Sequence, residues 1–149
     1  MSERIVEVAD ERGSLPLEVL RELEAVALWT LDQEGVGDAE ISVALVSDDT
    51  IAALNRDYLS HEGPTDVISF PLDDLPDRVV GDIYLGVEQA GRQAQEVGVP
   101  QLEELLRLTV HGVLHVLGWD HPDDESERAG SPMYRRQEEL LAGWMGRQR

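Results

Sequence analysis

The sequence of 149 residues contains no cysteine. This absence excludes disulfide bonds, thiolate metal ligands and a cysteine nucleophile. Long apolar runs are also missing, because no stretch approaches the roughly 20 residues that a membrane-spanning helix needs. The first residues, "MSERIVEVADERG", lack the basic and then apolar form of a signal peptide. We therefore expect a cytoplasmic protein with no membrane partner.

Lysine is absent as well, so all twelve basic residues are arginines, and the formal net charge is −19. Such an acidic chain repels polyphosphates at long range. The acidic residues are expected to form a solvated surface. A nucleic-acid substrate would therefore need a local group of cations, or a partner that delivers it.

Apolar residues that alternate with polar ones predict strands, and a spacing of three and four residues predicts helices. We expect strands at 4–9, 39–47, 66–70 and 81–86, and helices at 17–33, 48–58, 87–97, 102–117 and 132–147. Ser14 and Pro16 mark the start of the first helix, and Asp48 or Asp49 is expected to cap the second. Residues 72–77 are expected to form an acidic loop.

The length is that of one domain, 1–149, and no repeat or linker interrupts it. Strands and helices are interleaved along the chain. This order predicts an α/β (α+β) fold, a compact domain in which a mixed sheet of about four strands packs with about five helices. The apolar helix at 102–117 is expected to be buried and central, and to carry a metal site.

Three of the four histidines lie in the run "HGVLHVLGWDH" at 111–121. His111 and His115 are four residues apart, so on a helix they share one face. Gly118 is suited to end that helix, and the following turn can bring His121 back toward the other two. Three neutral nitrogen ligands and one open position are typical of a catalytic zinc. The alternative, three unrelated histidines, would bury two imidazoles without partners.

The spacing H-x-x-x-H-x-x-G-x-x-H is also that of the metzincin peptidases, which have a glutamate after the first histidine. Here that position is Gly112, which cannot act as a general base. Peptide hydrolysis by that mechanism is therefore disfavoured. Met133 resembles a Met-turn only weakly, because a methionine that opens an amphipathic helix is more often part of the core.

Together with four other segments, the histidine run resembles the YbeY family of bacterial endoribonucleases. The segments are "LNRDYLSHEGPTDVISFP" at 54–71, "GDIYLG" at 81–86, "EQAGRQAQEVG" at 88–98 and "MYRRQEELL" at 133–141, so the resemblance spans about 40 to 147. It implies a single-domain α/β protein with one zinc ion on His111, His115 and His121. It also implies an endoribonuclease that prefers single strands, matures the 3′ end of 16S ribosomal RNA and takes part in ribosome quality control.

One position departs from the family pattern. Many members have an arginine where this chain has Leu59, and the resemblance gives that arginine a role with the substrate phosphate. Arg56 is a candidate substitute, although an exposed helical arginine is the simpler interpretation. Arg107 lies one turn before His111, where it can reach the substrate or pair with an acidic residue.

Our hypothesis is that zinc binds or activates a water and polarises the scissile phosphate, with either water or the RNA 2′-OH as nucleophile. The catalytic candidates are His111, Arg107 and Asp120, the last as a residue that orients a ligand or as a plain acid at the helix end. Asp66 is expected either to border the cleft or to cap a turn. His61 is interpreted as a surface histidine, with substrate contact as the alternative.

A third interpretation is a metal-stabilised, non-enzymatic ribosome-assembly factor. The acidic charge favours basic ribosomal proteins as partners beside the small ribosomal subunit and its RNA. Arginines near the C-terminus are the candidates for a compensating cationic patch; they are Arg135, Arg136, Arg147 and Arg149.

Overall fold

The computed structural model describes residues 2–72 and 77–147. Its sheet has the order β1-β2-β4-β3, from strands β1 (Arg4–Asp10), β2 (Asp38–Val46), β3 (Val67–Pro71) and β4 (Arg78–Gly86). β1, β2 and β4 are parallel, and β3 is antiparallel to β4. The predicted four-stranded mixed sheet is therefore confirmed. Most of the loop predicted at 72–77, and Arg149, lie outside the described residues.

All five predicted helices form, within one residue of the expected ends. They are α1 (Leu17–Gln33), α2 (Asp48–Leu59), α3 (Val87–Val97), α4 (Gln101–Val116) and α6 (Pro132–Arg147). A further short helix, α5 (Glu125–Arg128), was not predicted, because four residues are too few to show a period.

The expected cap of α2 was wrong. Ser47, and not Asp48 or Asp49, is the N-cap, and its hydroxyl accepts a hydrogen bond from the backbone N–H of Thr50. A serine one residue earlier has its oxygen in reach of that N–H, and this leaves the two aspartates in the first turn. There their negative charges still favour the positive end of the helix dipole.

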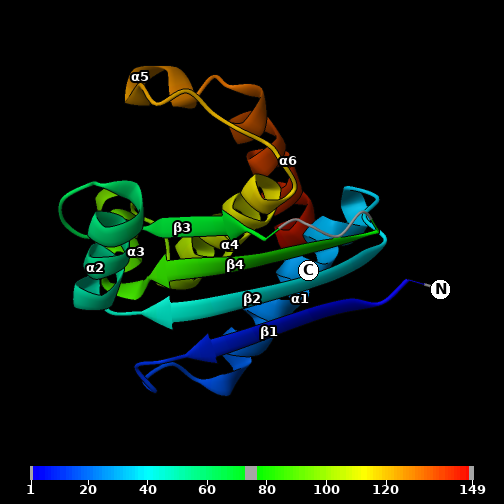
Figure 1. Cartoon of the computed structure of the whole chain (residues 1–149), viewed down its shortest axis with the longest axis horizontal. Helices are drawn as coiled ribbons and strands as arrows, with labels where there is room; N and C mark the ends of the chain where they lie inside the picture. The colour runs from blue at the N-terminus through cyan, green and yellow to red at the C-terminus, as the bar shows by residue number, and fades with distance from the viewer. Residues whose placement is uncertain (1, 73–76, 148–149) are drawn as a thin grey trace.

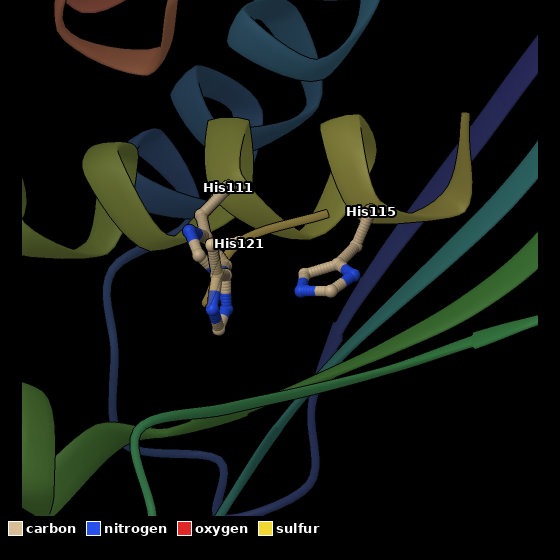
Figure 2. A group of neighbouring side chains, drawn as sticks. All are labelled: His111, His115 and His121. Atoms are coloured by element: carbon tan, nitrogen blue, oxygen red, sulfur yellow. The ribbon is translucent and has the colours of Figure 1, made fainter. Parts of the chain in front are cut away.

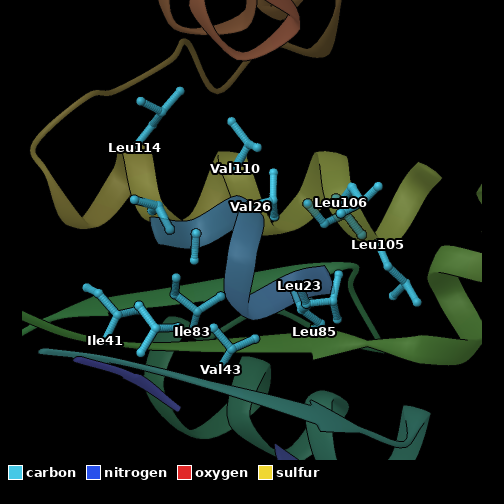
Figure 3. Close-up of a cluster of buried hydrophobic side chains, with 14 of the residues drawn as sticks. Leu23, Val26, Ile41, Val43, Ile83, Leu85, Leu105, Leu106, Val110 and Leu114 are labelled. Atoms are coloured by element: carbon cyan, nitrogen blue, oxygen red, sulfur yellow. The ribbon is translucent and has the colours of Figure 1, made fainter. Parts of the chain in front are cut away.

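The main core lies between the sheet and the helices α1 and α4, which Figure 3 shows on one side of the strands. Strand register aligns the apolar residues, since Val43 pairs with Ile83 and Leu45 with Leu85. A smaller cluster of Val46, Ile51 and Ile68 lies where α2 packs. The sheet and the helices that pack on it are therefore sufficient to bury the apolar residues.

α4 is the central helix, as predicted, and packs against α1, α3, α6, β3 and β4. Most of its residues are buried, from Glu104 to Val116. α5 stands apart from the sheet at the end of an extended segment, and α6 leads the chain back (Figure 1). In the part of the chain that the structure describes, no helix has the length and apolarity needed to cross a bilayer.

Candidate metal centre

His111 and His115 extend from one face of α4, and the chain after α4 brings His121 to them (Figure 2). The helix ends at Val116, and Gly118 has a φ of +102°. This conformation favours glycine, and it lets the chain reverse. The three ring centroids lie 5.0–5.3 Å apart. One ligand atom of each histidine lies within 4.8 Å of the others, as the predicted metal site requires.

The buried side chain of Gln137, on α6, determines which nitrogen of His111 is free. Its Oε1 lies 2.7 Å from His111 Nδ1, while its Nε2 donates to the carboxylate of Glu138 at 3.0 Å. Because the amide nitrogen is engaged elsewhere, the oxygen faces the ring and accepts from Nδ1–H. The unprotonated nitrogen of His111 is then Nε2. This arrangement resembles the orienting partners found behind metal-bound histidines.

His121 is oriented in a similar way by its own neighbour. Its Nδ1 lies 3.0 Å from the carbonyl oxygen of Pro122. A carbonyl only accepts, so Nδ1 carries the proton and Nε2 is again the free nitrogen. The two histidines therefore present equivalent atoms to the cluster.

Burial favours the neutral forms of His111 and His115. It lowers the pKa of His111 to about 4, against the opposing effect of the hydrogen bond with Gln137. Burial also lowers the pKa of His115, and the nearby His121 acts in the same direction. A neutral imidazole keeps the lone pair that a metal requires, so these ligands are available at neutral pH.

The donor set therefore fits a zinc ion. Three imidazole nitrogens are its common protein ligands, and among the described residues no cysteine or carboxylate closes the cluster as a fourth. His111, His115 and His121 are the residues that would hold the ion.

A cleft of about 420 Å³ opens beside the histidines. One side is formed by the region of α2 and β3, including Leu59, His61 and Asp66. The other side includes Arg128 and Tyr134. The volume is in the range of pockets that hold small molecules or a segment of a larger substrate.

Comparisons with known proteins identify the family to which this chain is related. The family model described as Endoribonuclease YbeY matches residues 6–145. The chain belongs to the YbeY family. It is 39% identical to Endoribonuclease YbeY of Bacillus licheniformis, over 92% of each chain. It is 44% identical to Endoribonuclease YbeY of Carboxydothermus hydrogenoformans, over 85% of each chain. The solution structure of TM1509 from Thermotoga maritima has a TM-score of 0.65 and 27% identity, covering 96% of this chain and 91% of that one.

Arg107, a catalytic candidate, lines the cleft of this YbeY family member but is held by three carboxylates. Its guanidinium lies 2.8 Å from Glu104, 2.9 Å from Glu138 and 3.2 Å from Glu103. These partners outweigh burial and raise the pKa of Arg107 above its ordinary value. Of the two alternatives for this residue, the structure therefore shows the pairing with acidic residues.

Asp120, another candidate, does not line the cleft. Its carboxylate accepts from the backbone N–H of His121 at 2.9 Å, so it holds the backbone of a ligand residue and not the imidazole. Asp66 borders the cleft, which is one of the two positions expected of it. Its carboxylate accepts from the N–H of Val67 at 2.8 Å.

His61 is exposed, as expected of a surface histidine. It also lines the cleft, which is the position that the alternative, contact with a substrate, requires. Leu59, at the position of the family arginine, also faces the cleft and is 44% exposed. Arg56 is not among the lining residues, and its exposed guanidinium pairs with the neighbouring Asp57.

Three of the four arginines expected to form a cationic patch near the C-terminus lie in the described part of the chain. Arg136 pairs with Glu34 at 2.8 Å, and Arg147 lies over the ring of Trp29 at 4.6 Å. Arg135 is exposed. Two of the three described arginines therefore already have partners within the chain.

Gly112 faces the sheet and not the cleft. A Cβ at this position would lie 2.7 Å from Cγ2 of Ile83 on β4, which is closer than real Cβ atoms approach. A glutamate here would therefore start inside the core, where it could not serve the metal centre. Close packing of α4 on β4 explains the glycine.

Gln137 and Arg128 are among the residues of the site that were not anticipated. Gln137 had a usable signal, because it lies at helical spacing between Met133 and Leu140–Leu141 and is thus a polar residue on an apolar face. Arg128 had none, since its segment shows no periodicity.

Proposed function

We propose that the chain is a zinc-dependent endoribonuclease that prefers single-stranded RNA and acts in the cytoplasm on ribosomal RNA, including the 3′ end of 16S RNA. The observation that carries this proposal is the convergence of His111, His115 and His121 beside a cleft, in a chain of the YbeY family. The relatives cited above are named endoribonucleases. A role in ribosome quality control is part of the same proposal.

Each residue of the site has a separate role in the proposed function. The three histidines hold the ion, and Gln137 and Pro122 keep the Nε2 atoms of His111 and His121 unprotonated. A bound zinc supplies Lewis acidity at a phosphate and lowers the pKa of a water toward about 7. No general base at position 112 is involved, because Gly112 is packed on Ile83. This division suits phosphodiester cleavage, in which the metal stabilises phosphoryl charge.

Metal analysis and cleavage assays test this function. We expect about one zinc per purified chain, cleavage of single-stranded RNA in preference to duplex RNA, and no cleavage of casein. Casein cleavage without RNA cleavage would instead support a metallopeptidase. A protein without zinc that still cleaves RNA would overturn the metal dependence.

The net charge of −19 favours a second candidate, a metal-stabilised assembly factor that binds basic proteins of the small ribosomal subunit. A strain that carries only the His115→Ala protein separates the two, since this half-buried side chain can be removed with little effect on the core. Sequencing of the small-subunit RNA ends is the readout. Unprocessed 3′ ends support the nuclease, and normal ends support the assembly factor.

A further inference from the structure

The cleft beside the histidines is lined by two arginines, Arg107 and Arg128. An RNA phosphate that enters a protein of net charge −19 needs an accessible local cation. Arg107 does not provide one. Its side chain is 23% exposed, and Glu103, Glu104 and Glu138 surround its guanidinium with more negative charge than it carries.

Arg128 is held in a different way. Its Nε donates to the carbonyl oxygen of Pro122 at 3.0 Å, and its Nη2 donates to that of Asp123 at 3.0 Å. These acceptors are neutral, so they orient the guanidinium without neutralising it. Its charge acts at longer range on the carboxylate of Asp124, whose pKa is lowered mainly by hydrogen bonds from Ser126 and to a smaller extent by Arg128. No ion pair joins Arg128 to a side chain that the structure describes.

The geometry also leaves donors available. A guanidinium has five N–H groups in one plane, and the two carbonyls engage only part of them. The plane matches the spacing of two phosphate oxygens, which a guanidinium can bind through parallel hydrogen bonds. Because Pro122 also accepts from His121, the same carbonyl holds both the ligand ring and the cation.

We propose that Arg128 is a substrate-binding residue of the cleft, which contacts a phosphate of the RNA next to the three histidines. The proposal rests on the proposed nuclease function. The phosphate contact then lies on the side of the cleft that carries His121. Arg56 is excluded by its position outside the cleft and its pairing with Asp57.

Binding of a fluorescent single-stranded oligoribonucleotide tests the proposal, measured by anisotropy over a series of salt concentrations with zinc-loaded protein at a temperature where cleavage is slow. The variants are Arg128→Gln, Arg128→Lys and the matched control Arg56→Gln. We expect Arg128→Gln to weaken binding about tenfold, because a charge-assisted hydrogen bond is lost. The slope of log K against log salt should fall by about 0.7, as for one phosphate contact with a single strand.

Arg128→Lys should restore the slope, since it keeps the charge, but only part of the affinity, since it lacks the planar fork. Arg56→Gln should leave both unchanged. Zinc content is measured for every variant. If Arg128→Gln and Arg128→Lys lose zinc and affinity to the same degree, Arg128 only holds the loop of His121, and the proposal is overturned.

Two further outcomes separate this proposal from the function on which it rests. Wild-type protein that cleaves RNA, together with an unchanged slope in Arg128→Gln, overturns the assignment of Arg128 alone. Wild-type protein that neither binds nor cleaves RNA overturns the nuclease function and the assignment with it.

Discussion

Two parts of the cleft hold their functional groups by different means. The core wall, formed by α4 and α6, carries His111, His115 and Gln137; His111 is 7% exposed and Gln137 is 2% exposed. The loop wall, residues 118–128, carries His121 and Arg128. Trp119, at the start of this wall, donates to Glu34, the C-cap of α1, at 2.8 Å. The hydrogen bonds around His121 and Arg128, in contrast, join residues only one to six positions apart, and two of these four are exposed.

The difference indicates that folding builds the core wall, whereas the loop wall depends on local hydrogen bonds that water can replace. A metal ion bound by both walls would join the loop wall to the rigid part of the molecule. Four changes test whether the two walls differ in stability and in metal binding.

Removal of one ligand from each wall should have the largest effect. His111→Ala and His121→Ala should each lose zinc and lower RNA cleavage about 1,000-fold, because a metal supplies several kcal/mol to phosphoryl transfer. The walls should differ in the metal-free proteins. His111→Ala leaves the buried Oε1 of Gln137 without its partner and should lower the free energy of unfolding by about 1–3 kcal/mol. His121→Ala should not, and urea denaturation with a chelator measures both; equal losses would contradict the contrast.

A fall in pH should lower the free energy of unfolding through His111, in the core wall. The pKa of His111 is about 4 in the folded protein against an ordinary value of 6.5, mainly because it is buried. The unfolded chain therefore takes up this proton first as the pH falls. The contribution of neutral His111 is complete above pH 6.5 and is lost progressively down to about pH 4, a change of roughly 3 kcal/mol in the free energy of unfolding.

Denaturation of metal-free protein between pH 7 and pH 4 checks this effect. The carboxylates contribute a background, so the comparison is with His111→Gln, which lacks the titrating ring. The wild type should lose stability more steeply than the variant. Parallel curves would show that His111 titrates normally.

Gln137 tests whether the core wall needs its orienting partner. Gln137→Leu keeps the apolar packing of α6 but removes the acceptor for His111 Nδ1–H, so the affinity for zinc should fall about 10- to 100-fold. Gln137→Glu is the matched control, because its carboxylate can still accept the hydrogen bond. Competition with a chelator gives the affinities, and a Leu variant that binds zinc as tightly as the wild type would assign Gln137 to packing alone.

The smallest effect is expected at the packing contact beneath the core wall. Gly112→Ala places a Cβ against the branched side chain of Ile83, and the repacking cost exceeds the gain in helix propensity. The free energy of unfolding should fall by about 1 kcal/mol. Gly146→Ala, on an exposed turn of α6 with open space around it, should raise it slightly. Thermal unfolding compares the two, and a stabilised Gly112→Ala would show that α4 can move away from β4.

Much of the core wall was predictable because its signals are local. The period of α4 and the four-residue spacing of His111 and His115 follow from helix geometry alone, and Gly118 marks the end of that helix in the sequence. The parallel order of β1, β2 and β4 was not predictable in detail, because strand pairing joins residues far apart along the chain.

The contacts of the loop wall could not be predicted from local sequence signals. α5 has no period, and the bonds of Arg128 to Pro122 and Asp123 are to backbone atoms, which leave no pattern in the side chains. The helical spacing of Arg107 from His111 predicts that it can reach the substrate or pair with an acidic residue. Its partner Glu138 lies on a different helix, 31 residues away, so its pairing could not be seen from the spacing.

The kinds of donor atom at the candidate metal centre follow from the amino-acid sequence. Three histidines, no cysteine and a glycine at position 112 define a nitrogen site without a protease base, because residue types and helical spacing are properties of the chain alone. Which of the two cleft arginines is paired with carboxylates and which is bound to backbone carbonyls follows from the tertiary structure. That outcome depends on how α4, α6 and the loop wall come together, since a charge is compensated by whatever packing places within a few ångströms of it.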